Sequence, residues 1–325
     1  MPHAIRFHKT GGPEVLQWEE VNVAPPGANE VQVRHKAVGL NYIDTYHRSG
    51  LYPLPLPSGV GAEAAGVIEA VGSGVTEFKV GDRVAYGQGP LGAYAEVKNH
   101  PWDRVVKLPD GISFEQGASM MLQGLTVQYL LRRLLRVPQK GELVVWHAAA
   151  GGVGLIACQW ARALGVQIIG TVSSEEKAKL AREHGCAHTI VYTQEDFVAR
   201  VAEITGGKKV AIVYDSVGKD TFMKSLDCLQ PRGLMVSYGN ASGAVGPTDL
   251  GILAAKGSLY VTRPTLASYV AKREELVAAA NELFEHVLAG RIKVAPRQQY
   301  ALKDAAQAHR DLEGRKTTGS TILVP

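Results

Sequence analysis

A glycine-rich turn between an apolar segment and a helical pattern constrains the fold of this chain more than any other feature. Residues 148–154 read Ala-Ala-Ala-Gly-Gly-Val-Gly and follow the apolar run Leu143–Trp146. Over residues 153–164 apolar side chains recur at steps of three and four, which predicts an amphipathic helix that ends at Gly165. The order of these segments predicts a buried strand, a tight turn and a helix.

Such a turn binds pyrophosphate, because its backbone N–H groups come close to the phosphates and the positive end of the helix favours their charge. Against the pattern G-x-G-x-x-G, Ala149 stands in the place of the first glycine, while Gly151 and Gly154 keep the other two places. We therefore predict a dinucleotide site, with Gly151, Gly152 and Val153 as cofactor-binding residues.

The end of the next strand should select the cofactor. Residues 167–172 predict a strand parallel to the first, and NAD-preferring sites hold an Asp or Glu about 20 residues beyond the glycines. This chain has Ser173, Ser174 and Lys177 there, which suit a 2′-phosphate and favour NADPH over NADH. Glu175 and Glu176 weaken the inference, because acids in the first turn of a helix are also explained by its positive end without any ligand.

Composition places the chain among globular proteins. It has 325 residues, 46% of them hydrophobic, enough for two domain cores of about 100–200 residues each. The formal net charge is +4 and the basic residues are scattered, which argues against a nucleic-acid-binding surface. The cysteines Cys158, Cys186 and Cys228 lack C-x-x-C spacing and fit a reducing compartment. With no signal-peptide pattern and no apolar segment of membrane-spanning length, we expect a cytoplasmic protein.

The pattern of elements changes along the chain and predicts its domains. Residues 1–122 alternate short β-type runs with Gly and Pro turns, which is typical of a mostly-β domain. Residues 123–264 alternate strands with helices, which predicts an α/β domain with a doubly wound parallel sheet. Residues 265–325 begin with a helical pattern over 269–288 and end in short β runs, and we expect them to return to the first domain.

Several motifs together resemble those of one enzyme family. They are Phe7–Leu16, Gly39–Tyr46, Gly61–Gly66, Gly81–Val84 and Tyr214–Gly218. Across nearly its full length the chain resembles the medium-chain dehydrogenases/reductases, specifically the zinc-independent quinone oxidoreductases of the zeta-crystallin type, and among them the bacterial NADPH:quinone reductases. The resemblance implies a GroES-like catalytic domain joined to a Rossmann domain that binds NADPH, with the active site in the cleft between them.

Zinc chemistry is excluded by the residue types. The zinc alcohol dehydrogenases of the wider superfamily place a cysteine where this chain has Asn41 and a histidine where it has Ala62. The third ligand should fall within residues 120–124, which contain no Cys, His or carboxylate. We therefore expect no metal. Asp44 and His47 are the remaining residues of metal-binding type nearby, and a lone surface histidine is the favoured interpretation of His47.

Without a Lewis acid the substrate must already be electrophilic, as quinones and conjugated enones are. The protein would then stack the acceptor against the nicotinamide and place donors where its oxygen gains negative charge. The candidates for this catalytic role are Asn41, Tyr46, Tyr52 and Gln123. Either tyrosine is equally explained as an amphipathic residue half-buried at a domain edge.

Further cofactor-binding residues are implied by the resemblance, where its motifs match this sequence. They comprise the segment that faces the nicotinamide, residues along the cofactor and a set around its adenosine end: Tyr42, Ile43, Asp44, Thr45, Tyr46, Tyr129, Tyr192, Ser216, Tyr238, Gly239, Asn240, Ala241, Pro264, Thr265, Leu266 and Arg315. Arg315 by sequence alone would be a solvated loop charge.

The resemblance also implies a homodimer. Residues 257–262 are apolar and β-branched, and they should form the last strand of the parallel sheet, whose open edge a second copy would cover. NADPH-dependent reduction of quinones is the expected activity. Reduction of alkenals or enones is the alternative within enzymes, and nucleic-acid binding or a structural crystallin role is the alternative of another class.

Overall fold

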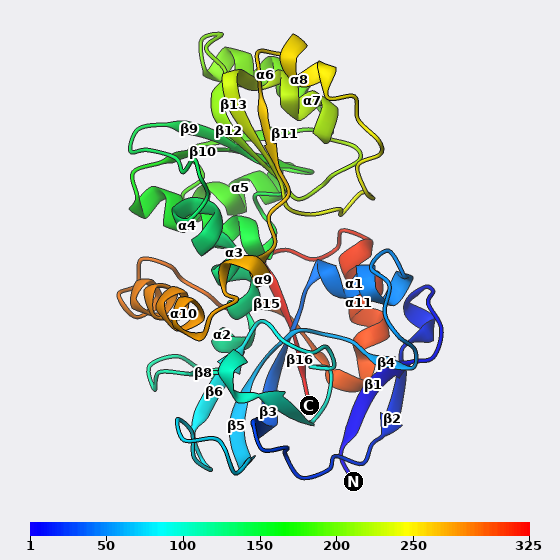
Figure 1. The fold of residues 1–325 in the computed structure, drawn as a ribbon. Helices are drawn as coiled ribbons and strands as arrows, with labels where there is room; N and C mark the ends of the chain where they lie inside the picture. Colours follow the sequence, from blue (N-terminus) through cyan, green and yellow to red (C-terminus); the bar gives the residue numbers. More distant parts are fainter. The chain divides into compact units, whose positions relative to one another are not determined.

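The structure is a computed structural model that describes all 325 residues, and it divides into two compact units. Unit 1 comprises Met1–Leu125 and Val270–Pro325, and unit 2 comprises Thr126–Tyr269 (Figure 1). From the sequence we expect the breaks after residues 122 and 264, whereas in the structure Gln123 falls in unit 1 and Thr265 in unit 2. No helix in the structure is both long enough and apolar enough to cross a membrane.

Unit 2 is built on a six-stranded parallel sheet. In chain order its strands are β9 (Leu143–Trp146), β10 (Gln167–Val172), β11 (His188–Val191), β12 (Val210–Asp215), β13 (Leu229–Ser237) and β14 (Tyr260–Thr262). Their order across the sheet is β11-β10-β9-β12-β13-β14, the doubly wound arrangement. The direction of winding reverses between β9 and β12, and such folds bind ligands beyond the carboxyl ends of the strands at that point.

Helices connect these strands and cover the sheet. Helices α4 (Gly152–Ala163) and α5 (Glu175–Glu183) pack together on one face, and α6 (Phe197–Ile204) and α7 (Phe222–Asp227) on the other (Figure 1). The unit also holds α8 (Gly251–Ala255), α9 (Leu266–Tyr269) and most of α3 (Met121–Arg132). The strand expected over residues 257–262 begins only at Tyr260, because Ser258 adopts a left-handed conformation with φ of 55°.

Unit 1 contains a seven-stranded sheet in the order β15-β16-β3-β5-β6-β8, with β7 paired to β3, and a three-stranded sheet in the order β2-β1-β4. The first sheet uses β3 (Glu30–Leu40), β5 (Glu63–Val71), β6 (Arg83–Tyr86), β7 (Val97–Pro101), β8 (Val106–Lys107), β15 (Pro296–Ala301) and β16 (Ser320–Val324). The second uses β1 (His3–Phe7), β2 (Gln17–Glu20) and β4 (Ser58–Gly59).

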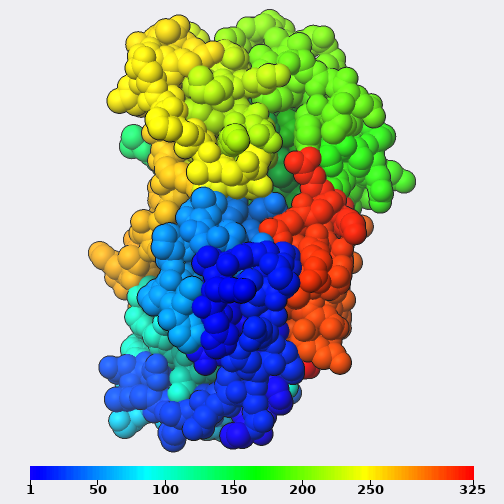
Figure 2. Space-filling view, turned by 90° about the vertical axis from the view of Figure 1, so that its right-hand side faces the viewer, coloured from blue at the N-terminus to red at the C-terminus, as the bar shows by residue number.

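The C-terminal segment belongs to unit 1 through strand pairing. Strand β16 runs antiparallel to β3, with Thr321 opposite Leu40 and Ile322 opposite Gly39. Helix α11 (Ala305–Glu313) packs beside the short helix η1 (Pro13–Val15), so that the two ends of the chain lie side by side within this unit (Figure 2). The expected helix over 269–288 is observed as α10 (Arg273–Leu288), after a break that separates it from α9.

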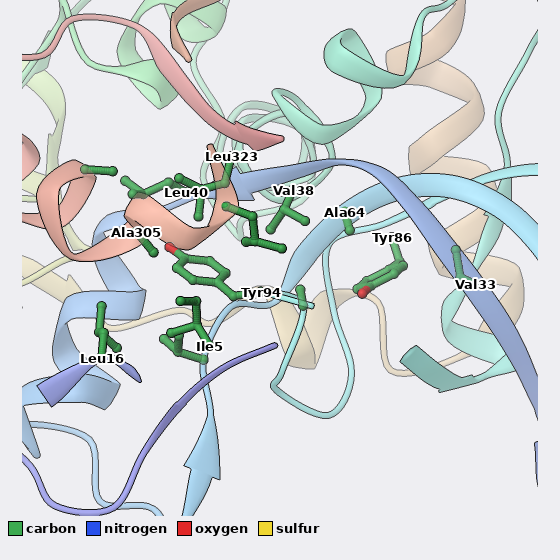
Figure 3. Packing of buried hydrophobic residues seen from close by; sticks show 14 of the residues in the cluster. Ile5, Leu16, Val33, Val38, Leu40, Ala64, Tyr86, Tyr94, Ala305 and Leu323 are labelled. Carbon is green, nitrogen blue, oxygen red and sulfur yellow. The ribbon is translucent and has the colours of Figure 1, made fainter. Parts of the chain in front are cut away.

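The remaining helices of unit 1 are α1 (Tyr42–Ser49), α2 (Phe114–Ala118), η2 (Trp102–Arg104) and η3 (Leu302–Asp304). Between its elements lies a closely packed apolar core that includes Ile5, Leu40, Tyr94 and Leu323 (Figure 3). Tyr94 is completely buried, and its hydroxyl is turned toward helix α11 (Figure 3). A buried hydroxyl needs a hydrogen-bond partner, and this one belongs to the network described below.

Candidate functional site

The glycine-rich turn of unit 2 joins β9 to α4. Ala148 adopts a left-handed conformation with φ of 56°. A Cβ at Gly154 would collide with the Ala148 carbonyl oxygen and the Ala149 backbone, so glycine is required there. Gly151 is the N-cap of α4, and no side chain caps this end of the helix. The first N–H groups of α4 therefore have no intrahelical acceptor and no side-chain cap, which is the arrangement that binds a phosphate group.

Beyond β10 the chain enters α5 through two serines. The Ser174 hydroxyl accepts a hydrogen bond from the Lys177 N–H at 3.3 Å and so caps the helix. Glu175 forms an ion pair with Arg182 at 2.5 Å. The charge of one of the two glutamates that would repel a 2′-phosphate is therefore balanced. The Ser173 carbonyl accepts from the Thr193 hydroxyl at 3.1 Å. The ends of β10 and β11 thus meet at Ser173, with the neighbouring Tyr192 40% exposed.

The ends of β12 and β13 form a second rim of the same sheet edge. The buried Asp215 carboxylate accepts from the Val217 and Gly218 N–H groups at 2.7 and 3.0 Å, and this fixes the turn that carries Ser216. Gly239 lies directly against Ser216, where a Cβ would collide with the Ser216 carbonyl oxygen. Ser216 therefore lies beside the turn Tyr238–Ala241. All five residues are among those expected to bind the cofactor.

The remaining expected residues of unit 2 lie at its boundary segment. Tyr129 stacks on Tyr269, with ring centroids 4.5 Å apart and an interplanar angle of 10°. The Thr265 hydroxyl lies 3.1 Å from that of Ser268, and Leu266 is buried. Pro264 follows Arg263, whose guanidinium donates to the Gly239 carbonyl at 3.0 Å and so links this segment to the Tyr238–Ala241 turn.

In unit 1 the candidate donors lie on or beside α1. Asn41 is the N-cap residue, and its backbone N–H donates to the Asp44 carboxylate at 2.9 Å. Gly50, with φ of 83°, ends the helix in the left-handed conformation typical of that position. The Tyr52 N–H then donates to the Tyr46 carbonyl at 3.1 Å. The local structure therefore brings Tyr52 back against the helix.

Three tyrosines form a cluster on this helix and the loop that follows it. The rings of Tyr42 and Tyr46 lie 5.7 Å apart, as expected for residues four apart on a helix, and those of Tyr46 and Tyr52 lie 5.2 Å apart. His47 lies 5.9 Å from Tyr52 and is only partly exposed. His47, expected as a lone surface histidine, is thus half-buried against the ring of Tyr52.

Asn41 and Gln123 are joined by a direct hydrogen bond, in which Gln123 Nε2 donates to Asn41 Oδ1 at 3.2 Å. Asn41 Nδ2 in turn donates to Glu63 Oε2 at 2.6 Å. The other oxygen of Glu63 accepts from the Leu122 N–H at 2.9 Å. At the far end the Ser320 hydroxyl lies 2.7 Å from Gln123 Oε1. The two amides were predicted from the sequence as candidate donors, whereas Glu63 and Ser320 were not, because their roles depend on strand pairing.

Glu63 is completely buried, and burial raises the pKa of its carboxyl group to about 8. The hydrogen bonds from Asn41 and Leu122 act in the opposite direction, because they favour the ionised form. Gly39 lies opposite Glu63 in the β3–β5 register, and a Cβ at Gly39 would collide with Glu63 Oε2. The absence of a side chain at residue 39 therefore makes room for this buried carboxyl group.

Asp44 belongs to a second buried network. Its carboxylate accepts a hydrogen bond from the Tyr94 hydroxyl at 2.9 Å. The same hydroxyl lies 3.1 Å from His309 Nε2. Arg48 Nη1 lies 3.0 Å from the other nitrogen of His309 and is also paired with Glu313 on α11. Burial raises the pKa of Asp44 to about 7 and lowers that of His309 to about 3. The Asp44 side chain, expected at the cofactor, is thus used to fix α1.

Comparisons with known proteins agree with this geometry. The family of the alcohol dehydrogenase GroES-like domain matches residues 27–110, and the zinc-binding dehydrogenase family matches residues 152–283. The chain is 60% identical to a quinone oxidoreductase of Pseudomonas aeruginosa over the whole length of both. It superposes with a TM-score of 0.98 on a crystal structure of Escherichia coli quinone oxidoreductase complexed with NADPH, at 58% identity, 99% of this chain and all of that one. The chain belongs to the quinone oxidoreductase family.

A more distant relative is a 2-haloacrylate reductase of Burkholderia, 47% identical over 100% of this chain and 99% of the relative. The two-domain architecture predicted from the sequence, a GroES-like domain and a Rossmann-type domain, is confirmed by the matched families and by the structural likeness. Membership of the medium-chain dehydrogenases/reductases is likewise confirmed.

The residues of this member of the family do not fit the zinc ion that the name of one matched family implies. The amides of Asn41 and Gln123 are hydrogen-bonded to each other, and amide groups are poor zinc ligands. Both oxygens of Glu63 already accept hydrogen bonds. No group of three or more His, Cys, Asp or Glu side chains in the structure is placed to hold a metal ion.

Proposed function

We propose that this protein uses NADPH to reduce quinones to hydroquinones. The observation that carries the proposal is the likeness, over the full length of the chain, to a quinone oxidoreductase whose crystal structure contains NADPH. When bound, NADPH supplies the hydride. The protein must hold the cofactor and the acceptor in contact and stabilise the negative charge that develops on the acceptor oxygen.

For the cofactor, the open end of α4 supports binding of the pyrophosphate by the N–H groups of Gly152 and Val153. Ser173, Ser174 and Lys177, at the end of β10 and the first turn of α5, supply hydroxyl donors and a cation for the 2′-phosphate. An aspartate or glutamate at that position would repel the phosphate, and Glu175 is engaged by Arg182. The sequence and the local geometry therefore both favour NADPH.

Other residues are proposed to surround the cofactor. The turns at Ser216 and Tyr238–Ala241 lie at the carboxyl edge of the unit 2 sheet, where doubly wound folds bind ligands. Tyr129, Tyr192 and Pro264–Leu266 belong to the same unit. In unit 1, residues 42–46 and Arg315 are proposed on the family resemblance. Asp44 would contact the cofactor through its backbone, because its side chain is buried.

For the acceptor, the N–H groups of Asn41 and Gln123 and the hydroxyls of Tyr46 and Tyr52 are the proposed donors. Each amide nitrogen has two hydrogens and uses one in the chain that links Asn41, Gln123 and Glu63, so one N–H of each is left for an oxygen that gains charge. Removal of water from such a site strengthens these bonds. A hydroquinone anion can take its proton from water, so no dedicated acid is required.

A homodimer is part of the proposal. Strand β14 is the last strand of the unit 2 sheet, and its residues Tyr260 and Val261 are 60% and 41% exposed. Native proteins rarely leave such an edge uncovered, and pairing with a second copy across a two-fold axis would cover it. We keep the cytoplasm as the proposed location, since all three cysteines are free thiols.

One substrate screen tests the proposal. Oxidation of NADPH and of NADH is followed with 1,4-benzoquinone, naphthoquinones, 2-alkenals, 2-haloacrylate and simple aldehydes, before and after exhaustive chelation. We expect quinones to give the highest kcat/KM, with NADPH preferred, with no loss on chelation and with no oxidation of simple alcohols. Faster reduction of alkenals or haloacrylate would replace the proposed activity with the enone alternative. Activity that chelators abolish would contradict the metal-free mechanism.

A further inference from the structure

The hydrogen-bond chain through Asn41 and Gln123 has a direction, because its two ends differ in kind. At one end stands the carboxyl group of Glu63, and at the other the hydroxyl of Ser320. Each amide between them has an oxygen that only accepts and a nitrogen that only donates. The orientation of one amide therefore dictates that of the next.

An ionised Glu63 accepts hydrogen bonds but donates none. Asn41 must then turn its nitrogen toward Glu63 and its oxygen toward Gln123, as the structure shows. Gln123 in turn directs its nitrogen to Asn41, which leaves its oxygen for the hydroxyl proton of Ser320.

The Ser320 end of the hydrogen-bond chain is also compatible with the reversed orientation of both amides. The Ser320 hydroxyl lies 3.0 Å from the Ser119 carbonyl oxygen, as well as 2.7 Å from Gln123 Oε1, and it has one proton for these two acceptors. With a protonated Glu63 that donates to Asn41 Oδ1, both amides turn over. Gln123 Nε2 then donates to Ser320, whose proton goes to Ser119. In this second arrangement every acceptor in the chain has one donor.

We propose that Glu63 and Ser320 are positioning residues for quinone reduction. From the two ends of the hydrogen-bond chain they fix the orientation of the Asn41 and Gln123 amides, that is, which side of each amide carries the oxygen and which the nitrogen. This inference rests on the proposed function, since it takes the two amides to contact the acceptor. Neither Glu63 nor Ser320 touches the acceptor in it.

Packing holds both end groups in place. Ser320 is buried, and the antiparallel register that pairs Thr321 with Leu40 brings it level with Asn41. Glu63 is buried opposite Gly39. The other titratable groups that bear on Glu63 are Asp44, on α1, and Tyr94. A hydroxyl and a carboxyl group held this rigidly are suited to orient two amides.

The two directions differ in their effect on the reaction. An ionised Glu63 puts a negative charge one hydrogen-bonded partner, Asn41, away from the acceptor oxygen, which itself becomes negative as the hydride arrives. A neutral Glu63 removes that repulsion, and each turned-over amide still uses only one of its two N–H groups within the chain, so that one remains for the acceptor. We therefore expect faster reduction when Glu63 is protonated.

Variants of Ser320 test one end of the chain in the full-length enzyme. With NADPH and 1,4-benzoquinone, Ser320→Ala should lower kcat about 3- to 10-fold, the scale of one disturbed hydrogen bond, and leave the KM for NADPH unchanged. Ser320→Thr keeps the hydroxyl and should restore most of the loss. Thr321→Val is the matched control, since it removes the neighbouring buried hydroxyl, which donates to Gln298, and it should leave kcat unchanged.

A double-mutant cycle separates positioning from mere packing. If Ser320 acts through Gln123, then Ser320→Ala should have no further effect on kcat in a Gln123→Leu background. The same fold loss in both backgrounds would overturn the role of Ser320, and so would wild-type kcat in Ser320→Ala. Thermal unfolding of each variant shows whether it is folded, and a misfolded Ser320→Ala leaves Ser320→Thr and Glu63→Gln to decide.

Glu63→Gln tests the other end through the pH profile. Wild-type kcat should decline as the pH rises through about 8, the pKa that burial gives Glu63, while Glu63→Gln should lack this decline. Asp110→Asn, which changes a fully exposed carboxyl group of the same unit, should retain it. A decline that persists in Glu63→Gln would overturn the role of Glu63. A wild-type enzyme that reduces no quinone would instead contradict the proposed function itself.

Discussion

The methyl group of Ala149 lies where a side chain at Gly170 would be, since a Cβ at residue 170 would come within 2.5 Å of it. Ala149 is completely buried and occupies the place of the first glycine of the dinucleotide motif. The missing side chain on β10 thus compensates for the additional one in the turn. A departure from the motif that looked unfavourable in the sequence is accommodated by a second residue on the adjacent strand.

From this pair we expect Gly170→Ala to destabilise the protein by about 1–3 kcal/mol, the usual cost of overpacking. Replacing Ala149 by Gly in the same molecule should restore part of the loss, and only part, because the new Cβ also approaches Cys186 Sγ to 2.7 Å. Chemical denaturation of the single and double variants measures this. Gly246→Ala, where nothing lies within 4 Å, is the control. Additive effects of the two changes would contradict the compensation.

Lys177→Ala should weaken NADPH binding by about 1.5–3 kcal/mol, the range for a charge-assisted contact, and leave NADH binding nearly unchanged. Titration calorimetry with both cofactors measures the difference. Lys179→Ala, two residues along the same helix and exposed, should change neither affinity. Equal losses for NADPH and NADH would show that Lys177 does not contact the 2′-phosphate.

Tyr46→Phe and Tyr52→Phe should each lower kcat with quinones about 10- to 100-fold, which corresponds to one lost hydrogen bond in the transition state. Neither should abolish turnover, because the quinone is electrophilic without help. Phenylalanine keeps the ring contact between these residues, at 5.2 Å, so the cluster should stay packed. Tyr300→Phe, which removes a hydroxyl bonded to Asp311, is the control. Unchanged kcat in both site variants would assign the tyrosines a packing role.

The pH dependence of stability should reveal the buried Asp44. Its pKa is about 7 in the folded protein, against the ordinary value of 3.8 for an aspartate in water, so between these values the folded state binds more protons than the unfolded state. Its contribution to the free energy of unfolding therefore falls as the pH rises from about 4 to about 7. His309, with a lowered pKa, acts in the opposite direction.

The difference between wild type and Asp44→Asn isolates this contribution. We expect the stability of the wild type relative to Asp44→Asn to decrease by about 1–3 kcal/mol between pH 5 and pH 7. Urea denaturation at several pH values measures it. Asp110→Asn, which changes a fully exposed carboxylate, should show no such trend. A difference that is constant with pH would contradict the raised pKa.

The proposed dimer should have a mass of about twice the 34.8 kDa of one chain by light scattering at micromolar concentration. Val261→Glu on β14 places a charge where the second copy would pair and should shift the protein to monomers. Val80→Glu, at a residue that is 61% exposed in unit 1, should leave the mass unchanged. A monomeric wild type would reject pairing through this edge.

The sequence predicted best what depends on neighbours in the chain. Strands β9 and β10 have the bounds expected from their apolar runs, and α4 follows the glycine turn as its periodicity indicates. The start of β14 was missed because a left-handed Ser258 leaves no trace in a pattern of apolar residues. Asn41 and Gln123 were found as candidates, whereas Glu63 and Ser320 were not. The place of Glu63 depends on the register of β5 against β3, and that of Ser320 on the register of β16 against β3, and no local pattern encodes either.

The pairing of β16 with β3 also bears on how the protein is made. Residues 320–324 are translated after all of unit 2, so the nascent chain can complete its nucleotide-binding sheet while the Val38–Leu40 part of β3, beyond the segment paired with β7, still has an unpaired edge. An exposed strand edge is prone to wrong pairing and aggregation. Synthesis therefore passes through a stage at which half of the molecule has its final core and the other half still depends on a strand that has not left the ribosome.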